Sequence, residues 1–349
     1  MELQNIITQA LSLRASDLHL TAGLIPMVRV DGNLRSLGPD AEILSDSQVR
    51  QVLQMLMSPE RWASFSEHLE EDFSFSHSEW GRWRVNAFHQ YRGAALVMRA
   101  IPSEIPTLAQ LQAPALLSQL ALLSSGLILV TGPTGSGKST LLAAMLDHAN
   151  RSLKGHLLTI EDPIEFVHFS HQCVVNQREV GLHSHSFEAA LRSALREDPD
   201  VILIGELRDL ATIRLALTAA ETGHLVLASL HTSSAPQAID RVVDVFSAEE
   251  KDMVRTLMAD SVAAVISQTL CPRMDGVGRV AAHEVMVATP AVRNLIREGK
   301  IAQLYSMLQT GAQFGMQTLD QSLNALRQSG QITAETARLL SRFPGRSSP

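Results

Sequence analysis

The sequence predicts an α/β fold with a mostly parallel sheet, preceded by a small α+β domain, and two observations support this. After residue 115, short apolar segments alternate with helical patterns, which is typical of parallel strands covered by helices. Before residue 100, short strands and turns dominate instead. A chain of 349 residues also exceeds the size at which a single hydrophobic core stops growing. We therefore expect an N-terminal domain at 1–100, a linker at 101–114, a core with a helical C-terminal part at 115–342, and a disordered tail at 343–349.

The elements of the N-terminal domain follow from hydrophobic spacing and turn residues. Apolar residues three and four positions apart predict helices at 2–13 and 47–57. β-rich or alternating segments predict strands at 17–20, 27–30, 34–37, 72–76, 81–89 and 94–100. Asp31-Gly32 predicts a hairpin turn between the second and third of these strands. Pro102 and Pro106 indicate a short, stiff linker.

The elements of the core alternate between the two types. Apolar runs predict strands at 127–131, 156–160, 201–205 and 224–230. Helical spacing predicts helices at 139–148, 187–198 and 210–222, with Ser186 and Asp209 as N-caps and Gly223 just past the last one. Beyond residue 235 we expect a mostly helical chain.

Composition limits the classes of function. Hydrophobic residues make up 45% of the chain and charged residues 19%, as in ordinary globular proteins. A formal net charge of −7 argues against non-specific nucleic-acid binding. Cys173 and Cys271 stand alone, so neither a zinc site nor a disulfide framework is expected. The first residues lack a basic start followed by an apolar run, so no secretory signal is predicted and we expect a cytoplasmic protein.

The most specific pattern is a phosphate-binding loop, G-x-x-x-x-G-K-[ST], at 132–139. Its glycines let the backbone curl so that several N–H groups can face one phosphate. Lys138 would reach the β- and γ-phosphates, and the Ser139 hydroxyl would bind Mg²⁺. The nucleotide-binding residues are expected to be Gly132, Pro133, Thr134, Gly135, Ser136, Gly137, Lys138, Ser139 and Thr140.

Two acidic segments follow predicted strands. Glu165 lies in the first segment, 161–165, and Glu206 follows the strand at 201–205. Side chains at the carboxyl ends of parallel strands can position water or metal for hydrolysis. Gly205 stands where an Asp often ends such a strand, so Glu206 must support Mg²⁺ or water itself. The alternative is that these acids cap the following helices, a role that we assign to Asp209.

Two histidines flank the strand at 224–230. His224 opens the strand and His231 follows it. A histidine at a strand end could contact a γ-phosphate, although a single histidine is more often a satisfied structural residue. Both roles remain open on the sequence alone.

Several stretches together resemble the secretion-motor ATPase superfamily, and most of all the type IV pilus retraction ATPase family (PilT type). They are GPTGSGKST (132–140), TIEDPIEFVH (159–168), REDPDVILIGELRD (196–209) and LTAAETGHLVLASLHTSSAPQAIDRVVDVF (217–246). The likeness extends to ASDLHLTAG (15–23), RVNAF (84–88), AVRNLIREGK (291–300) and TGAQFGMQTLDQSL (310–323). The tetracysteine element and additional N-terminal domain that are usual in extension motors are missing, which favours the retraction branch.

The resemblance implies a RecA-like P-loop ATPase domain behind a PAS-like N-terminal domain, assembled as a homo-hexamer with ATP bound between each subunit's two domains. It implies that Glu165 is the general base, that Glu206 supports Mg²⁺, and that His224 or His231 reads the phosphate. It also implies that Arg84 and Arg99, and less securely Arg82, reach the nucleotide. On residue pattern alone, such alternating arginines are usually solvated.

We therefore predict a cytoplasmic, Mg²⁺-dependent ATPase that powers pilus retraction. It would dock at the inner membrane through a pilus platform protein and could pair with a paralogous retraction ATPase; no nucleic-acid partner is expected. One alternative is an accessory paralogue of the retraction motor, or a pilus or secretion extension ATPase. A second is a nucleotide-gated adaptor in a heteromeric ring, against which the intact Glu165 and Glu206 argue.

Overall fold

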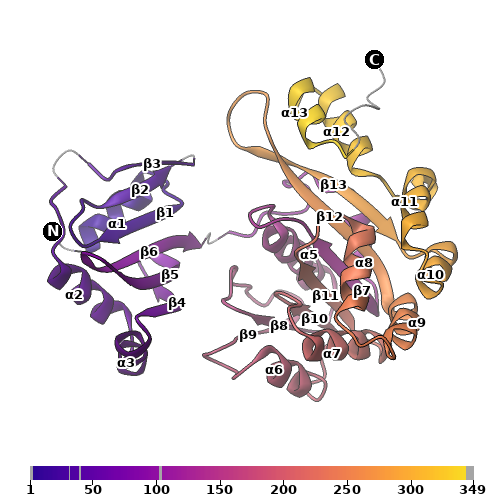
Figure 1. The fold of residues 1–349 in the computed structure, drawn as a ribbon, viewed down its shortest axis with the longest axis horizontal. Helices are drawn as coiled ribbons and strands as arrows, with labels where there is room; N and C mark the ends of the chain where they lie inside the picture. The colour runs from indigo at the N-terminus through magenta and orange to yellow at the C-terminus, as the bar shows by residue number, and fades with distance from the viewer. Residues whose placement is uncertain (1–2, 31, 39–40, 102–103, 343–349) are drawn as a thin grey trace. The chain divides into compact units, whose positions relative to one another are not determined.

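The computed structural model describes residues 3–30, 32–38, 41–101 and 104–342. It divides the chain into two compact units, residues 1–104 and 105–349 (Figure 1). The predicted hairpin turn includes Asp31 and the predicted linker includes residues 102–103, so both fall partly outside the described residues. The tail at 343–349 lies wholly outside them. In the part of the chain that the structure describes, no helix is both long and apolar enough to cross a membrane.

The first unit is a six-stranded antiparallel sheet packed against helices. The strands are β1 (Asp17–Thr21), β2 (Met27–Val30), β3 (Asn33–Ser36), β4 (Glu70–His77), β5 (Gly81–Gln90) and β6 (Gly93–Ile101), in the order β3-β2-β1-β6-β5-β4. The helices are α1 (Leu3–Ser12), α2 (Asp46–Leu56) and α3 (Pro59–His68). The α+β prediction for this unit is confirmed. Sequence reasoning missed α3, which begins at the N-cap Ser58 with Pro59 at its first position.

The second unit contains a seven-stranded sheet in the order β13-β12-β7-β11-β10-β8-β9. These strands are β7 (Gly126–Thr131), β8 (His156–Glu161), β9 (Val174–Glu179), β10 (Val201–Ile204), β11 (Leu225–Leu230), β12 (Val262–Pro272) and β13 (Arg279–Val287). All neighbouring strands are parallel except β12 and β13. The predicted α/β class with a mostly parallel sheet is confirmed.

Helices cover both faces of this sheet (Figure 1). They are α4 (Leu116–Leu120), α5 (Lys138–Ser152), α6 (Phe187–Ala194), α7 (Leu210–Glu221), α8 (Ala235–Asp244), α9 (Lys251–Ser261), α10 (Pro290–Arg297), α11 (Ile301–Thr310), α12 (Leu319–Gln328) and α13 (Ala334–Leu340). Along β7, Leu127 and Leu129 pack with α6 to α11, whereas Ile128 and Val130 pack with α4 and α5. This alternation explains why β7 reads as one continuous apolar run.

Beyond residue 235 the chain is mostly helical, as predicted, but sequence reasoning missed two strands there, β12 and β13. Strands β12 and β13 pair in antiparallel register over nine residues and extend the sheet beyond β7. The segment from Val262 to Ile266 is almost entirely buried, so its apolar run carries no period of two. Periodicity cannot separate such a buried strand from a buried helix segment. The hairpin has a functional consequence, because β12 lies directly against β7 and the loop that follows it.

Candidate active site

The phosphate loop connects the carboxyl end of β7 to the first residue of α5. Gly132, Gly135 and Gly137 have φ values of 150°, 78° and 86°, which side chains rarely adopt, so these glycines make the curl possible. Helix α5 begins at Lys138, and its unpaired N–H groups and positive dipole end therefore face the loop. This geometry is suited to an anion.

Lys138 is buried and folds back onto its own loop. Its Nζ donates to the carbonyl oxygens of Gly132 (2.9 Å) and Pro133 (3.0 Å). Burial lowers the pKa of Lys138, and the charges of Glu206 and Glu165 act in the opposite direction. Both glutamates are therefore close enough to Lys138 to influence its charge.

A chain of polar contacts connects Lys138 to Glu206 through His231. Nδ1 of His231 lies 3.4 Å from Lys138 Nζ, and Nε2 lies 3.3 Å from Oε1 of Glu206. Since an ammonium group can only donate, Nδ1 accepts and Nε2 carries the proton toward Glu206. Arg208 Nε donates to the other oxygen of Glu206 at 2.8 Å. The carboxyl ends of β7, β10 and β11 thus bring these residues together.

Gly205 lies between β10 and Glu206 at a crowded position. A Cβ added there would lie 3.3 Å from the Cα of Glu161, so a side chain would push against the end of β8. Ser229 on β11 donates to the Gly205 carbonyl at 2.5 Å. Glycine at this position therefore lets β8 and β10 approach, and Glu206 becomes the first side chain able to project from the strand end.

The other acidic segment, 161–165, contains a buried carboxyl group, that of Glu161, which accepts hydrogen bonds from within the chain. Oε1 of Glu161 accepts from Thr159 at 2.6 Å and from Gln177 at 3.3 Å, while Oε2 accepts from the Glu165 N–H at 3.4 Å. Burial raises the pKa of Glu161 to about 7. Glu165 itself is exposed, as a group that contacts substrate must be. Asp162, next to Glu161, lies 3.7 Å from Arg208.

His224 lies at the opposite end of β11 from His231. Its backbone carbonyl accepts from Gly126 at the start of β7, and its Nδ1 lies 2.9 Å from the Ala219 carbonyl at the end of α7. The six residues of β11 separate the two histidines by roughly 20 Å. Of these two histidines, His231 is the one that reaches the phosphate loop.

Arg84 and Arg99 belong to the first unit, where they face each other across β5 and β6. Arg99 donates to Asp17 at 2.8 Å, and Arg84 donates to Asp72 at 2.8 Å. The Arg99 side chain is 68% exposed, whereas that of Asp17 is 6% exposed, so the acid anchors a guanidinium that remains accessible. Arg82 donates to Ser74.

The donors at the loop fit a magnesium nucleotide. Ser139 supplies a partly exposed hydroxyl, and Glu206 supplies a carboxylate at the adjoining strand end. These are the hard oxygen ligands that Mg²⁺ prefers, with phosphate and water completing its shell. Ser136 Oγ is buried and has no hydrogen-bond partner among the described residues, as expected of a hydroxyl placed for a phosphate oxygen. In the same part of the chain, no cluster of three or more acidic, His or Cys side chains could hold a metal without such additional ligands.

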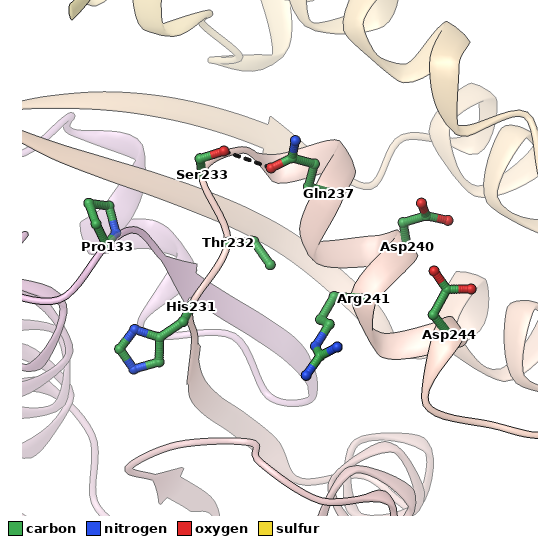
Figure 2. A pocket seen from close by; sticks show the side chains of 8 residues that line it. All are labelled: Pro133, His231, Thr232, Ser233, Gln237, Asp240, Arg241 and Asp244. Carbon is green, nitrogen blue, oxygen red and sulfur yellow. Dashed lines mark hydrogen bonds between the residues drawn. The ribbon is translucent and has the colours of Figure 1, made fainter.

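A cavity of about 530 Å³ opens beside His231 (Figure 2). It is lined by Pro133, His231, Thr232, Ser233, Gln237, Asp240, Arg241 and Asp244. The last four residues lie on α8, and sequence reasoning missed them because the helical pattern showed only which residues are buried. Thr232 is fixed at the cavity wall by Thr131, whose Oγ1 lies 2.6 Å from the Thr232 carbonyl.

The sequence and the fold are both similar to those of known proteins. The family model described as type II/IV secretion system protein matches residues 1–338. The chain is 55% identical to the Pseudomonas aeruginosa protein named type IV pilus retractation ATPase PilT, over 99% of both chains. It is 41% identical to the type IV pilus ATPase PilU of the same organism, over 97% of this chain and 88% of PilU. A crystal structure of the pilus retraction motor PilT with bound ADP matches with a TM-score of 0.91 and 44% identity, covering 99% of this chain and 98% of that one.

Proposed function

The chain belongs to the type II/IV secretion system protein family, and from this premise we propose that it is an ATP-hydrolysing motor that powers type IV pilus retraction. The observation that carries the proposal is the chain of contacts Lys138–His231–Glu206 at the phosphate loop. Its three side chains, a buried lysine, an imidazole and a carboxylate, belong to the segments that follow β7, β11 and β10. The full-length likeness to retraction ATPases supports the mechanical role.

Binding begins with a change of partners at Lys138. Its Nζ now donates to two loop carbonyls. We propose that it turns to the β- and γ-phosphates, while the loop N–H groups and the N-terminus of α5 hold the phosphate oxygens. Ser139 would hold Mg²⁺ and Glu206 would support it, and the ion would supply positive charge against the phosphates. Thr134 and Thr140 complete the polar edge of the loop.

Hydrolysis needs a base and a group that responds to the γ-phosphate. We assign the base to Glu165, whose backbone N–H is fixed by Glu161 and whose carboxylate is exposed. Glu165 takes a proton from water as the water oxygen attacks phosphorus and the bond to the ADP oxygen breaks. His231, between Lys138 and Glu206, is positioned to donate from Nε2 or to exchange partners when the γ-phosphate leaves. His224 is assigned to capping the end of α7.

Arg84 and Arg99 are proposed to bring positive charge to the nucleotide, by analogy with the family resemblance. An arginine that reaches a transferring phosphoryl group is worth about 10³–10⁵ in rate. The exposure of Arg99 and its fixed partner Asp17 are consistent with this role. We further propose a homo-hexamer that works at the cytoplasmic side of the membrane, with a pilus platform protein as the recipient of the motion and a paralogous ATPase as a second partner.

The experiment combines turnover with a cell phenotype. Purified full-length protein should release phosphate from ATP with Mg²⁺, and the solution mass should be measured with and without ATP. Deletion of the gene should leave excess, immobile pili, because retraction is lost while assembly continues. A strain complemented with Glu206→Gln should look like the deletion.

Two alternatives give different outcomes. An extension motor predicts that deletion removes the pili, and an accessory motor predicts retraction that is weakened but present. The greater identity to PilT than to PilU favours the main motor. An adaptor that only binds nucleotide predicts no phosphate release, and the complete Lys138–His231–Glu206 arrangement favours the enzyme over it.

A further inference from the structure

We propose that Gln268 and His283, on the β12–β13 hairpin, are a positioning pair that holds the phosphate loop in its nucleotide-binding shape. Neither residue touches the reacting atoms. Their action passes through the backbone of Ser136, inside the loop. This inference rests on the proposed function, because it concerns the affinity of the same nucleotide site.

Gln268 supports the loop from the β12 side. It is only 4% exposed, and its Nε2 donates to the Ser136 carbonyl at 2.6 Å. Ser136 is itself buried at the centre of the loop. A buried carbonyl without a donor is costly, so this one hydrogen bond favours the curled loop over alternatives that turn the carbonyl away.

His283 fixes which way the Gln268 amide points. Its Nε2 lies 3.1 Å from Gln268 Oε1, and the ring is 2% exposed. Burial lowers the pKa of His283 to about 4, so the ring is neutral at physiological pH. Because Oε1 can only accept, Nε2 of His283 must carry the proton. A flipped amide would place its NH₂ against that N–H and its oxygen against the Ser136 carbonyl. His283 therefore holds the amide in the one orientation that satisfies both neighbours.

Two glycines of the loop allow this close approach. A Cβ on Gly137 would lie 2.7 Å from Gln268 Nε2, and a Cβ on Gly132 would lie 2.4 Å from the Gln268 carbonyl oxygen. Real Cβ atoms are not found at such distances. Part of the glycine pattern of the loop is thus explained by contact with β12 as well as by phosphate binding.

The pair is anchored in the C-terminal part of the chain. The His283 N–H donates to Ser322 Oγ on α12 at 3.0 Å, and its carbonyl accepts from Gln317 Nε2 at 2.8 Å. A continuous hydrogen-bonded path therefore runs from Ser136 through Gln268 and His283 to the start of α12. The shape of the phosphate loop and the position of this segment are connected through a rigid, buried contact.

The test measures ADP affinity by calorimetry and steady-state ATP turnover for full-length variants. Gln268→Met keeps the volume of the side chain but removes its donor and acceptor. We expect the ADP Kd and the KM for ATP to rise about tenfold while kcat changes less than threefold, since binding shape is lost but no reacting group is. Gln331→Met is the matched control, because it makes the same substitution at a side chain whose hydrogen bond goes to Ser329, outside the path from Ser136 to the start of α12. It should leave the ADP Kd within twofold.

A double-mutant cycle separates positioning from general stability. His283→Phe should raise the ADP Kd about threefold in the wild-type background and should have no further effect in Gln268→Met. Independent, multiplying effects on the Kd would overturn the pairing. If Gln268→Met does not fold, Gln268→Leu makes the same test, since it also removes both the donor to Ser136 and the acceptor toward His283.

Failure of the inference can be distinguished from failure of the proposed function. Lys138→Ala is assayed beside the other variants. If the wild-type chain does not bind ADP, the assignment of the phosphate loop fails. If wild type binds, Lys138→Ala loses binding and Gln268→Met keeps wild-type affinity, the loop assignment stands and the positioning pair is refuted.

Discussion

Nε2 of His231 lies 3.3 Å from Oε1 of Glu206, and on its other side the same ring lies 3.4 Å from Lys138 Nζ. One neutral imidazole thus separates the cation expected on the phosphates from the carboxylate expected beside Mg²⁺. Loss of the γ-phosphate would release Lys138 and alter the whole chain of contacts. The ring is therefore placed where a change in the nucleotide can be passed on to the ends of β10 and β11.

Glu206→Gln should bind ATP but lose hydrolysis. The substitution keeps the shape of the side chain and leaves the phosphate loop intact, but it removes the charge beside Mg²⁺ and weakens the pairing with Arg208. Phosphate release should fall at least about 10²-fold, with the ATP Kd within about threefold of wild type. Calorimetry and a turnover assay measure the two quantities, and near wild-type turnover would remove Glu206 from the mechanism.

His231→Gln and His224→Gln form a matched pair at the two ends of β11. His231→Gln should reduce kcat about 10²-fold, because a glutamine amide cannot contact Lys138 and Glu206 at the same time in the way that the two ring nitrogens do. His224→Gln should leave kcat within about twofold, because its side chain contacts only the end of α7. Equal losses in the two variants would contradict the assignment of His231 alone to the site.

Glu161→Gln should change how stability depends on pH. The folded pKa of Glu161 is raised to about 7, so between about pH 4.5 and 7 the unfolded chain loses this proton while the folded chain keeps it. Stability from this group is therefore greatest at low pH, falls through that window by up to about 3 kcal/mol, and is level above it. Glutamine cannot titrate and mimics the protonated form.

Thermal unfolding from pH 5 to 8 measures this effect. The Tm of wild type relative to that of Glu161→Gln should fall as the pH rises toward 7 and should then stay constant. A difference in Tm that is the same at every pH would show that Glu161 does not hold its proton in the folded chain.

Arg99→Ala, compared with Arg29→Ala, tests the arginine proposal. Both side chains pair with the buried Asp17, at 2.8 Å and 3.9 Å respectively. Arg99→Ala should lower ATP turnover by about 10³ or more if its charge reaches the phosphates, whereas Arg29→Ala should remain near wild type. If the two variants lower turnover equally, the loss reflects an unpaired Asp17 and Arg99 has only a structural role.

Local residue patterns were enough to predict the phosphate loop, four parallel strands of the core (β7, β8, β10 and β11) and the α+β character of the first unit, but not β9 or β12. The loop needs three glycines, a lysine and a serine within eight positions, and β7 and α5 are recognisable on either side of it. These features depend on residues that lie close together in the sequence. Sequence alone also placed Glu206 and His231 at strand ends, because parallel strands end at a common edge.

Other contacts depend on which strands become neighbours, and no local pattern encodes that. The sequence placed His224 at the start of β11 and His231 after its end, but it did not show that His224 contacts the end of α7 whereas His231 contacts Lys138 and Glu206. It did not place Gln268 against Ser136, because 132 positions separate them and strand β12 was not predicted. Hydrogen bonds between distant segments form only after the apolar faces have packed, so the tertiary structure decided which polar residues support the phosphate loop and which histidine contacts Lys138.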